Sequence, residues 1–290
     1  MTARIAALTF IAMAAFAANT LLARRALGAD LIDAAAFMSL RTLFGAAALL
    51  LIVLPKWRRR ARSAADWRSA AMLALYMIAF SFAYRSVGAG IGAVIFFGVV
   101  QLTMIAAALA GGERFSIVGW SGLLMAGAGL VYLVSPGLTA PDPAGAALMG
   151  LAGVAWGFYS LLGRGGADPV EGTANNFLCA VPLVVAAALP FIDDMRITAA
   201  GFGLAALSGA ITSGFGYVVW YAALKGLSAG RAATVQLSVP VLSALGGVVW
   251  LSEALTPRLL IAGVATLGGI GIVLAQRTIR SVPLARAGYE

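Results

Sequence analysis

The sequence contains no histidine and a single cysteine, Cys179, among its 290 residues. Without histidine, the chain cannot build a histidine general base, a histidine-containing metal site or a histidine pH switch. One cysteine excludes an internal disulfide, and Cys179 lies in an apolar run where it is expected to be a small buried hydrophobe. We therefore expect no metal site and no cofactor.

Charged residues are also scarce. They make up 11% of the chain, whereas hydrophobic residues make up 62%. Soluble domains carry about 25% charged residues. A water-soluble chain of this length could not hide so much apolar surface in one core, so the sequence predicts a protein whose solvent is the lipid bilayer.

The net charge of +9 does not indicate nucleic-acid binding. The basic residues are not spread over one polar face but cluster at the ends of apolar runs, where the positive-inside rule places them. The expected partners are therefore the lipid bilayer and a small-molecule substrate, with no nucleic acid.

Apolar runs of spanning length fill most of the chain. A transmembrane helix needs about 20 apolar residues. Ten such runs are visible, and the loops between them leave no room for a separate soluble domain. The predicted fold is an all-α membrane protein with helices near 4–23, 33–54, 69–84, 87–110, 117–135, 145–162, 173–192, 199–222, 228–251 and 258–276.

The chain repeats itself at an offset of 140 residues without a gap at the clearest matches. Arg24 corresponds to Arg164, Ala89-Gly90 to Ala229-Gly230, and Glu113 to Glu253. The repeat divides the chain into a first five-helix half over 1–136, a second over 137–277 and a tail over 278–290. Five is an odd number, so the halves must be inverted relative to each other. Inverted repeats with a substrate site between them are typical of transporters.

The basic residues fix an orientation. If the loop from Lys56 to Arg62 is cytoplasmic, fourteen Lys and Arg lie on the cytoplasmic side and six on the other. This asymmetry predicts that both termini are cytoplasmic. The six are Arg24, Arg25, Arg41, Arg85, Arg196 and Arg258.

No Asp, Glu or Lys lies at the centre of a predicted span, which argues against a proton relay through the membrane. Arg41 is the ionised group well inside a span. Two interpretations are open for it. The guanidinium either snorkels to the outer headgroups or binds a carboxylate of the substrate.

Aromatic and amide side chains within the spans are the substrate-site candidates. Aromatic residues suit a planar or apolar substrate, although they also form interfacial belts. Amides in lipid need partners, and hydrogen bonding between helices is the alternative for them. We predict a central cavity between the halves, bordered by Asn19, Tyr76, Phe80, Gln101, Trp156, Tyr159, Tyr217 and Gln236.

Three residues are candidates for gating or hinge motion. Pro240 lacks an N–H and is expected to bend its helix, freeing the carbonyl of Gln236. Glu113 and Glu253 end the fourth and ninth helices. They are either gates on opposite faces of the membrane or anchors of the loops that follow, where Ser116 and Thr256 are expected to cap the next helices.

The second half also resembles a known family. Its motifs are similar to those of the EamA family of the drug/metabolite transporter superfamily. They are Ala223-Leu224-Lys225, Ala229 to Ala233, Pro240-Val241, Glu253 to Pro257 and, earlier in the half, Trp156-Gly157-Phe158-Tyr159. The first half departs from the pattern, with Val100 opposite Pro240. The resemblance implies an exporter of amino acids or other metabolites in the bacterial inner membrane. The aromatic amino-acid exporters of the YddG type are the branch it suggests.

The sequence thus predicts an alternating-access exporter of small organic metabolites, with amino acids, aromatic or otherwise apolar, taken from the resemblance. An exporter or permease of a nucleobase, vitamin or drug-like amphiphile, and a pore without gates, remain alternatives. An enzyme is not expected, because histidine and paired intramembrane carboxylates are lacking. A homodimer is compatible with the sequence, which sets no oligomeric state.

Overall fold

A computed structural model describes residues 2–57, 66–112, 115–137, 140–163, 168–227 and 235–275, and within these ranges the chain is helical. The first half contains α1 (Ala3–Gly28), α2 (Ala34–Trp57), α3 (Trp67–Ala83), α4 (Ala89–Ala110) and α5 (Ile117–Val134). The second contains α6 (Pro143–Leu162), α7 (Pro169–Ala188) with η1 (Leu189–Asp194), α8 (Ala199–Leu207), η2 (Ser208–Phe215), α9 (Gly216–Leu224), α11 (Ser238–Leu251) and α12 (Pro257–Ala275).

These helices confirm the membrane fold expected from the sequence. Within the described ranges, eight helical runs are long and apolar enough to span a bilayer, and α3 and α11 are shorter apolar helices of 17 and 14 residues. The run Ala199–Leu224 is one span formed by α8, η2 and α9 in succession. The chain is a multi-pass membrane protein.

The caps explain where several helices begin. Ser116 Oγ accepts from the backbone N–H of Gly119 at 3.4 Å, and Thr256 Oγ1 accepts from that of Leu259 at 3.2 Å. Each hydroxyl satisfies an N–H that a helix start leaves without an intrahelical partner. The capping role predicted for Ser116 and Thr256 is therefore confirmed.

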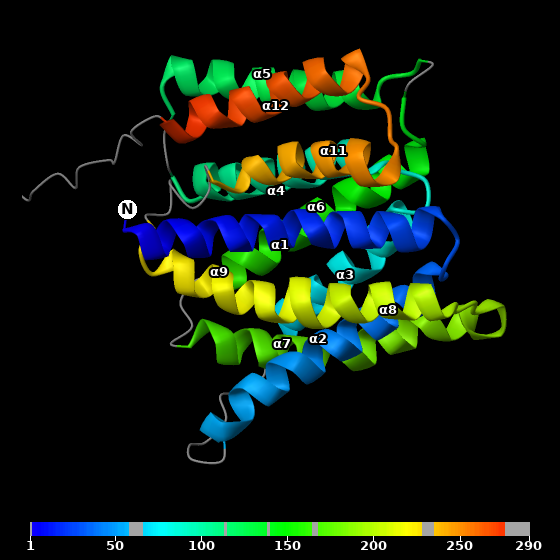
Figure 1. Cartoon of the computed structure of the whole chain (residues 1–290). Helices are drawn as coiled ribbons and strands as arrows, with labels where there is room; N and C mark the ends of the chain where they lie inside the picture. Colours follow the sequence, from blue (N-terminus) through cyan, green and yellow to red (C-terminus); the bar gives the residue numbers. More distant parts are fainter. Residues whose placement is uncertain are drawn as a thin grey trace, which may run out of the picture.

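The two halves are interleaved and run in opposite directions. Figure 1 shows α1 beginning beside the N label at the left and α6 beginning at the right. The packing follows the repeat: α6 packs on α3 and α4, and its counterpart α1 packs on α9 and α11. Counterparts also pair with each other, α2 with α7, α4 with α11 and α5 with α12. The interface between the two halves therefore runs through the centre of the molecule.

Two spans differ from the regular helices predicted. Span 199–222 was expected to be an ordinary helix, but Ser208–Phe215 forms a π-helix within it. Span 228–251 was expected to be continuous, but a turn at Leu237 separates the helical residues Val235 and Gln236 from α11, which begins at Ser238. A proline two residues into α11 explains this break, because Pro240 has no N–H to continue an earlier helical turn.

At the outer end, defined as the end holding the α1–α2 and α3–α4 loops, hydrogen bonds join the halves. Asp142 accepts from the backbone N–H of Gly145 at 2.7 Å and from Ser86 Oγ at 2.9 Å. The Gly145 bond, followed by the Ser86 bond, holds the pKa of the Asp142 carboxyl below its usual range. Asp33 likewise accepts from the N–H of Arg196 at 2.8 Å.

Helices α5 and α12 approach closely through glycine, at the top of Figure 1. A Cβ at Gly122 would lie 2.7 Å from the carbonyl oxygen of Gly269, whereas a Cβ at Gly127, in the same helix, would meet nothing within 4 Å. Glycine is therefore required at 122 by backbone proximity, as in other small-residue helix pairs.

We expect Gly122→Val to destabilise the protein by about 1–3 kcal/mol, the usual cost of overpacking. The measurement is the melting temperature of the purified full chain in detergent. Gly127→Val is the matched control, because it makes the same change in helix propensity without a clash. Equal melting temperatures for the two variants would contradict the close approach.

Candidate functional site

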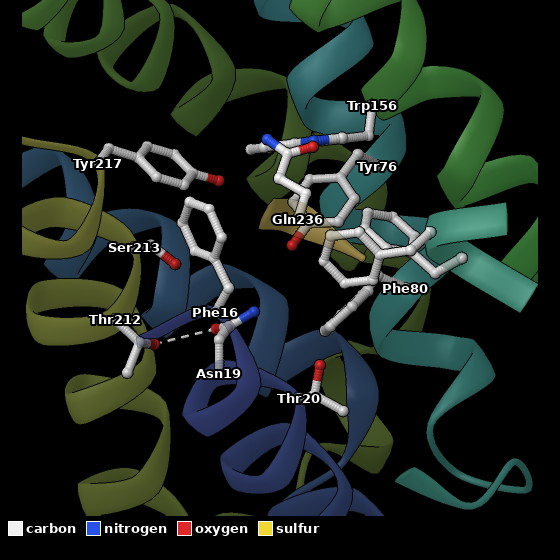
Figure 2. A pocket seen from close by; sticks show the side chains of 12 residues that line it. Phe16, Asn19, Thr20, Tyr76, Phe80, Trp156, Thr212, Ser213, Tyr217 and Gln236 are labelled. Carbon is white, nitrogen blue, oxygen red and sulfur yellow. Dashed lines mark hydrogen bonds between the residues drawn. The ribbon is translucent and has the colours of Figure 1, made fainter. Parts of the chain in front are cut away.

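A cavity lies between the halves at the centre of the membrane fold (Figure 2). It encloses about 420 Å³ of space outside the atoms, counting its open mouth. Helices α1, α3, α4, α6 and α9, with η2, contribute to its wall. The lining residues are Phe16, Asn19, Thr20, Tyr76, Phe80, Phe96, Phe97, Trp156, Thr212, Ser213, Tyr217 and Gln236.

The cavity lies on the axis that relates the halves. Phe16 and Trp156 are equivalent positions under the 140-residue offset, as are Phe96 and Gln236, and all four line the cavity. A group on a symmetry axis meets both repeats, which is the usual place for a substrate in carriers built from inverted repeats.

Aromatic rings form one wall of the cavity. The indole of Trp156 has its centre 4.8 Å from the ring of Tyr76 and 5.4 Å from that of Tyr217, both in tilted arrangements. Phe16 meets Tyr217 edge to face at 6.0 Å. These separations lie in the favourable range for aromatic pairs. The rings thus hold one another in place and present apolar faces to the cavity.

Polar groups form the opposite wall, around the π-helix. Ser208 Oγ donates to Asn19 Oδ1 at 2.8 Å, and Thr212 Oγ1 lies 3.1 Å from the same oxygen (Figure 2). The wider turn of a π-helix shifts the side chains that follow it, and such turns occur often at functional sites. Here Thr212 and Ser213, within η2, both line the cavity.

Arg41 lies directly behind this site. It is fully buried, which rules out the interpretation that its guanidinium snorkels to the outer headgroups. Its Nη2 donates to Tyr76 Oη at 2.6 Å and its Nε to Ser213 Oγ at 3.4 Å. The guanidinium carbon also stands 5.2 Å from the centre of the Tyr76 ring and 4.9 Å from that of Phe80. Burial is maintained because α2 packs against η2 and α3.

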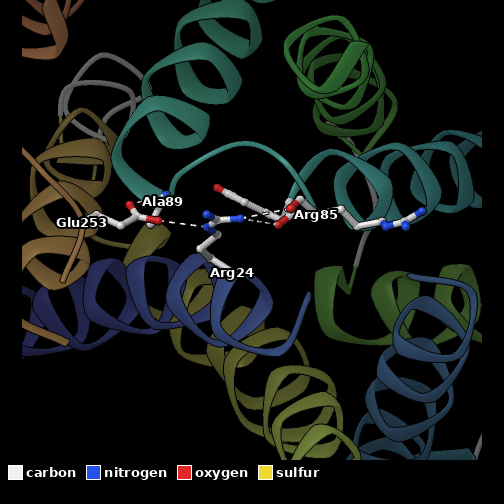
Figure 3. A network of polar contacts seen from close by, with 5 residues as sticks. Arg24, Arg85, Ala89 and Glu253 are labelled. Atoms are coloured by element: carbon white, nitrogen blue, oxygen red, sulfur yellow. Dashed lines mark hydrogen bonds and ion pairs between the residues drawn. The ribbon is translucent and has the colours of Figure 1, made fainter. Parts of the chain in front are cut away.

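A polar clasp closes the outer end of the fold (Figure 3). The clasp consists of Arg24, Glu253 and the start of α4. Arg24 Nε pairs with Glu253 Oε1 at 2.9 Å, and the backbone N–H of Ala89 donates to Glu253 Oε2 at 2.7 Å. Arg24 Nη1 also donates to the carbonyl oxygens of Tyr84 at 3.1 Å and Arg85 at 3.2 Å.

The clasp joins the two halves, because Glu253 follows α11 whereas Arg24 and Ala89 belong to the first half. The carboxylate sits at the N-terminus of α4, where a helix favours negative charge. Glu253 therefore anchors a helix of the other half, in addition to its ion pair. Arg24 is one helical turn beyond Thr20, so the clasp covers the outer side of the cavity.

The structure brings together most of the predicted substrate-site residues. Asn19, Tyr76, Phe80, Trp156, Tyr217 and Gln236 line the cavity. Gln101 and Tyr159 are buried but do not line it. Each lies one helical turn beyond a lining residue, Phe97 for Gln101 and Trp156 for Tyr159. The Nε2 of Gln101 has no hydrogen-bond partner among the described residues.

The gating candidates lie in three different settings. Glu253 belongs to the clasp, and Pro240 is buried in the first turn of α11, beside the break at Leu237. Glu113 lies outside the described residues. No group of three or more His, Cys, Asp or Glu side chains could hold a metal in the ranges that the structure describes.

Five cavity residues were not predicted from the sequence: Phe16, Phe96, Phe97, Thr212 and Ser213. The repeat itself could have identified two of them. Phe16 is equivalent to Trp156 and Phe96 to Gln236. A hydroxyl cluster in a span, Ser208, Thr212 and Ser213, was the available signal for the others in η2, because hydroxyls in lipid need partners.

Comparisons with known proteins agree with this architecture. Residues 3–135 and 143–275 each match the model of the EamA-like transporter family. The uncharacterized protein PA1977 of Pseudomonas aeruginosa is 50% identical over 276 residues, which cover 94% of this chain and 96% of that protein.

More distant relatives carry the name of transporter. The uncharacterized transporter YwfM of Bacillus subtilis is 28% identical, with 86% of each chain covered. An uncharacterized transporter of Archaeoglobus fulgidus is 28% identical over 66% of this chain and 70% of its own. One solved crystal structure shares the fold at a TM-score of 0.66 and 21% identity, covering 93% of this chain and 98% of that one.

Proposed function

We propose, from the fact that this chain belongs to the EamA-like transporter family, that it exports small organic metabolites by alternating access through its central cavity. The chain is a membrane transporter rather than an enzyme. Amino acids with aromatic or other apolar side chains are the proposed substrates, as in the aromatic amino-acid exporter branch of the superfamily.

One observation carries the proposal: a cavity on the axis between the halves combines an aromatic wall with a polar wall. Ligand sites of this kind are mostly apolar, with a few placed polar groups that fix orientation. The rings of Tyr76, Trp156 and Tyr217 suit a planar side chain, and the hydroxyls and amides opposite suit its polar backbone.

Alternating access is supported by the clasp. A half-buried ion pair that joins the halves over the cavity closes the outer side, and its rupture would let the halves rock apart. Arg24 and Glu253 are 24% and 21% exposed, so the pair lies at the edge of water and can be resolvated when it opens. We propose Glu253 as an outer gate on this ground.

Counterflow in reconstituted vesicles tests this function. Vesicles containing the full chain and loaded with unlabelled phenylalanine are expected to accumulate labelled phenylalanine transiently, with saturable kinetics. Flux of a nucleobase or vitamin instead would change the substrate class but keep the carrier. Flux proportional to concentration, without counterflow, would identify a pore and reject the proposal.

We further propose that the protein resides in the bacterial inner membrane with both termini in the cytoplasm. The clasp end would then face outward, in agreement with the basic residues counted above. Reporter fusions after Asp142 and at Glu290 are expected to report opposite sides, with Glu290 in the cytoplasm. The same side for both fusions would contradict the ten-span topology.

Pro240 is proposed as a hinge. It lies in the first turn of α11, where the helix is already interrupted, and its equivalent in the first half is Val100. Pro240→Ala is expected to let the helix continue through Leu237 to Gln236, keep affinity within a few-fold and slow turnover. The measurement is counterflow rate at equal protein levels, with Val100→Ala as control. An unchanged rate would assign Pro240 to a static bend.

A further inference from the structure

We propose that Arg41 creates an anion subsite in the cavity, so that substrates bind by a carboxylate to the hydroxyls of Tyr76 and Ser213. The proposal rests on the transport function above and specifies its substrate class as carboxylate-bearing solutes. Arg41 acts through the two hydroxyls and is therefore a positioning residue.

The first support is the charge of Arg41 itself. The side chain is 0% exposed, and within the described parts of the chain no carboxylate forms an ion pair with it. Its Nη1 has no hydrogen-bond partner there either. An uncompensated buried charge is costly and is normally retained in a membrane protein for function. An anionic substrate would supply the missing counter-charge.

The second support is the direction of the hydroxyl protons. A guanidinium has only donors, so Tyr76 Oη and Ser213 Oγ must accept from it. Each hydroxyl then directs its own proton elsewhere. Both residues line the cavity. Two polarised O–H donors, backed by a positive charge, therefore converge on the same space.

The third support is the rest of the polar wall. Asn19 Oδ1 already accepts from Ser208, which leaves the amide nitrogen of Asn19 as a further donor, turned away from Thr212 in Figure 2. None of the described residues that line the cavity is acidic. The site thus attracts an anionic group but offers an ammonium no carboxylate.

This arrangement makes the carboxylate necessary and an α-amino group dispensable. Three probes with the same ring separate these features: 3-phenylpropionate carries only the carboxylate, phenethylamine only the amine, and L-phenylalanine both. We expect 3-phenylpropionate and L-phenylalanine to stabilise the purified full chain in nanodiscs against heat, and phenethylamine not to do so.

Substitutions at Arg41, Tyr76 and Ser213 test whether the binding of 3-phenylpropionate depends on the subsite. Arg41→Met is expected to weaken 3-phenylpropionate binding about a hundredfold, the effect of unit charges about 6 Å apart at an effective dielectric constant of about 20. Tyr76→Phe and Ser213→Ala are expected to weaken it about tenfold each, as for one hydrogen bond to a charged group. Arg41→Lys should restore part of the affinity because it restores the charge.

Two readouts separate this role from a structural one. Arg41→Met without ligand is expected to melt no lower than the wild type, because it removes an unpaired buried charge. Ser81→Ala is the matched control for Ser213→Ala: Ser81 is also buried, but its hydroxyl donates to the carbonyl of Met77 within its own helix. It should leave probe binding unchanged.

The outcomes are distinct. Equal stabilisation by phenethylamine and 3-phenylpropionate, or 3-phenylpropionate binding unchanged in Arg41→Met, Tyr76→Phe and Ser213→Ala, would overturn the subsite. Stabilisation by chloride alone, removed when gluconate replaces it, would assign Arg41 to a resident chloride and also overturn it. Saturable counterflow of phenethylamine would leave the carrier standing without the subsite. Absence of saturable flux for every solute would reject the proposed function, while the binding comparison would still decide the subsite.

Discussion

Glu253→Gln is expected to lower the counterflow rate at least tenfold while leaving the protein folded. The change removes the charge from a carboxylate that joins Arg24 to the start of α4. Each charge-assisted hydrogen bond contributes about 1.5–3 kcal/mol, and loss of about 1.4 kcal/mol changes a two-state population tenfold. The outer-closed state then becomes too rare for efficient cycling.

Counterflow of the same solute at equal protein levels measures this effect. Arg25→Gln is the matched control, because Arg25 is exposed at the same end of α1. The exchanged pair Arg24→Glu with Glu253→Arg should recover part of the rate, since the charges are again complementary, although Ala89 N–H loses its acceptor. A wild-type counterflow rate in the Glu253→Gln variant would contradict the gate and would show that Glu253 only anchors the loop.

The repeat extends this expectation to the other side of the membrane. Arg164, Glu113 and Ala229 occupy the positions equivalent to Arg24, Glu253 and Ala89. All three lie outside the described residues, and a gate formed by Glu113 at the cytoplasmic side stays a prediction from the sequence. Two clasps that alternate would give each half an equivalent role, as inverted repeats require.

Local patterns in the sequence predicted most of the architecture. Outside span 228–251, apolar runs predicted where the helical spans begin and end to within about five residues, because every backbone polar group in lipid must be satisfied within the span. The cavity residues Asn19, Tyr76 and Trp156 were identifiable from the sequence, because polar and aromatic side chains in the middle of a span are candidates for a substrate site.

The features that could not be predicted from the sequence are those that depend on contacts between distant segments of the chain. Glu253 and Arg24 are 229 residues apart, and both were visible only as isolated charges. Gln101 was expected at the cavity but lies one turn beyond it, because the position of a residue along its helix depends on how the halves slide together. The π-helix has no sequence signature of its own, so the hydroxyl cluster around Ser213 marked a polar site but not the direction in which its side chains point.

Trp156 is expected to provide the largest part of the affinity for ring-bearing solutes. Its indole packs between Tyr76 and Tyr217 and stands at the symmetry axis opposite Phe16. Removing it exposes the ring of the substrate to an empty space. Burial of an aromatic ring and its stacking together contribute about 3 kcal/mol, which corresponds to about a hundredfold in affinity.

Trp156→Ala should therefore weaken 3-phenylpropionate binding about a hundredfold, and should weaken butyrate, which has a carboxylate and no ring, only a few-fold. Phe158→Ala is the matched control: Phe158 lies two residues further along α6, is 46% exposed and should change neither affinity when it is replaced. Equal losses for the two solutes in Trp156→Ala would show that the indole supports the fold of the site rather than the ring of the substrate. A selective loss would locate the ring at the aromatic wall, with its carboxylate reaching across to the hydroxyls in front of Arg41.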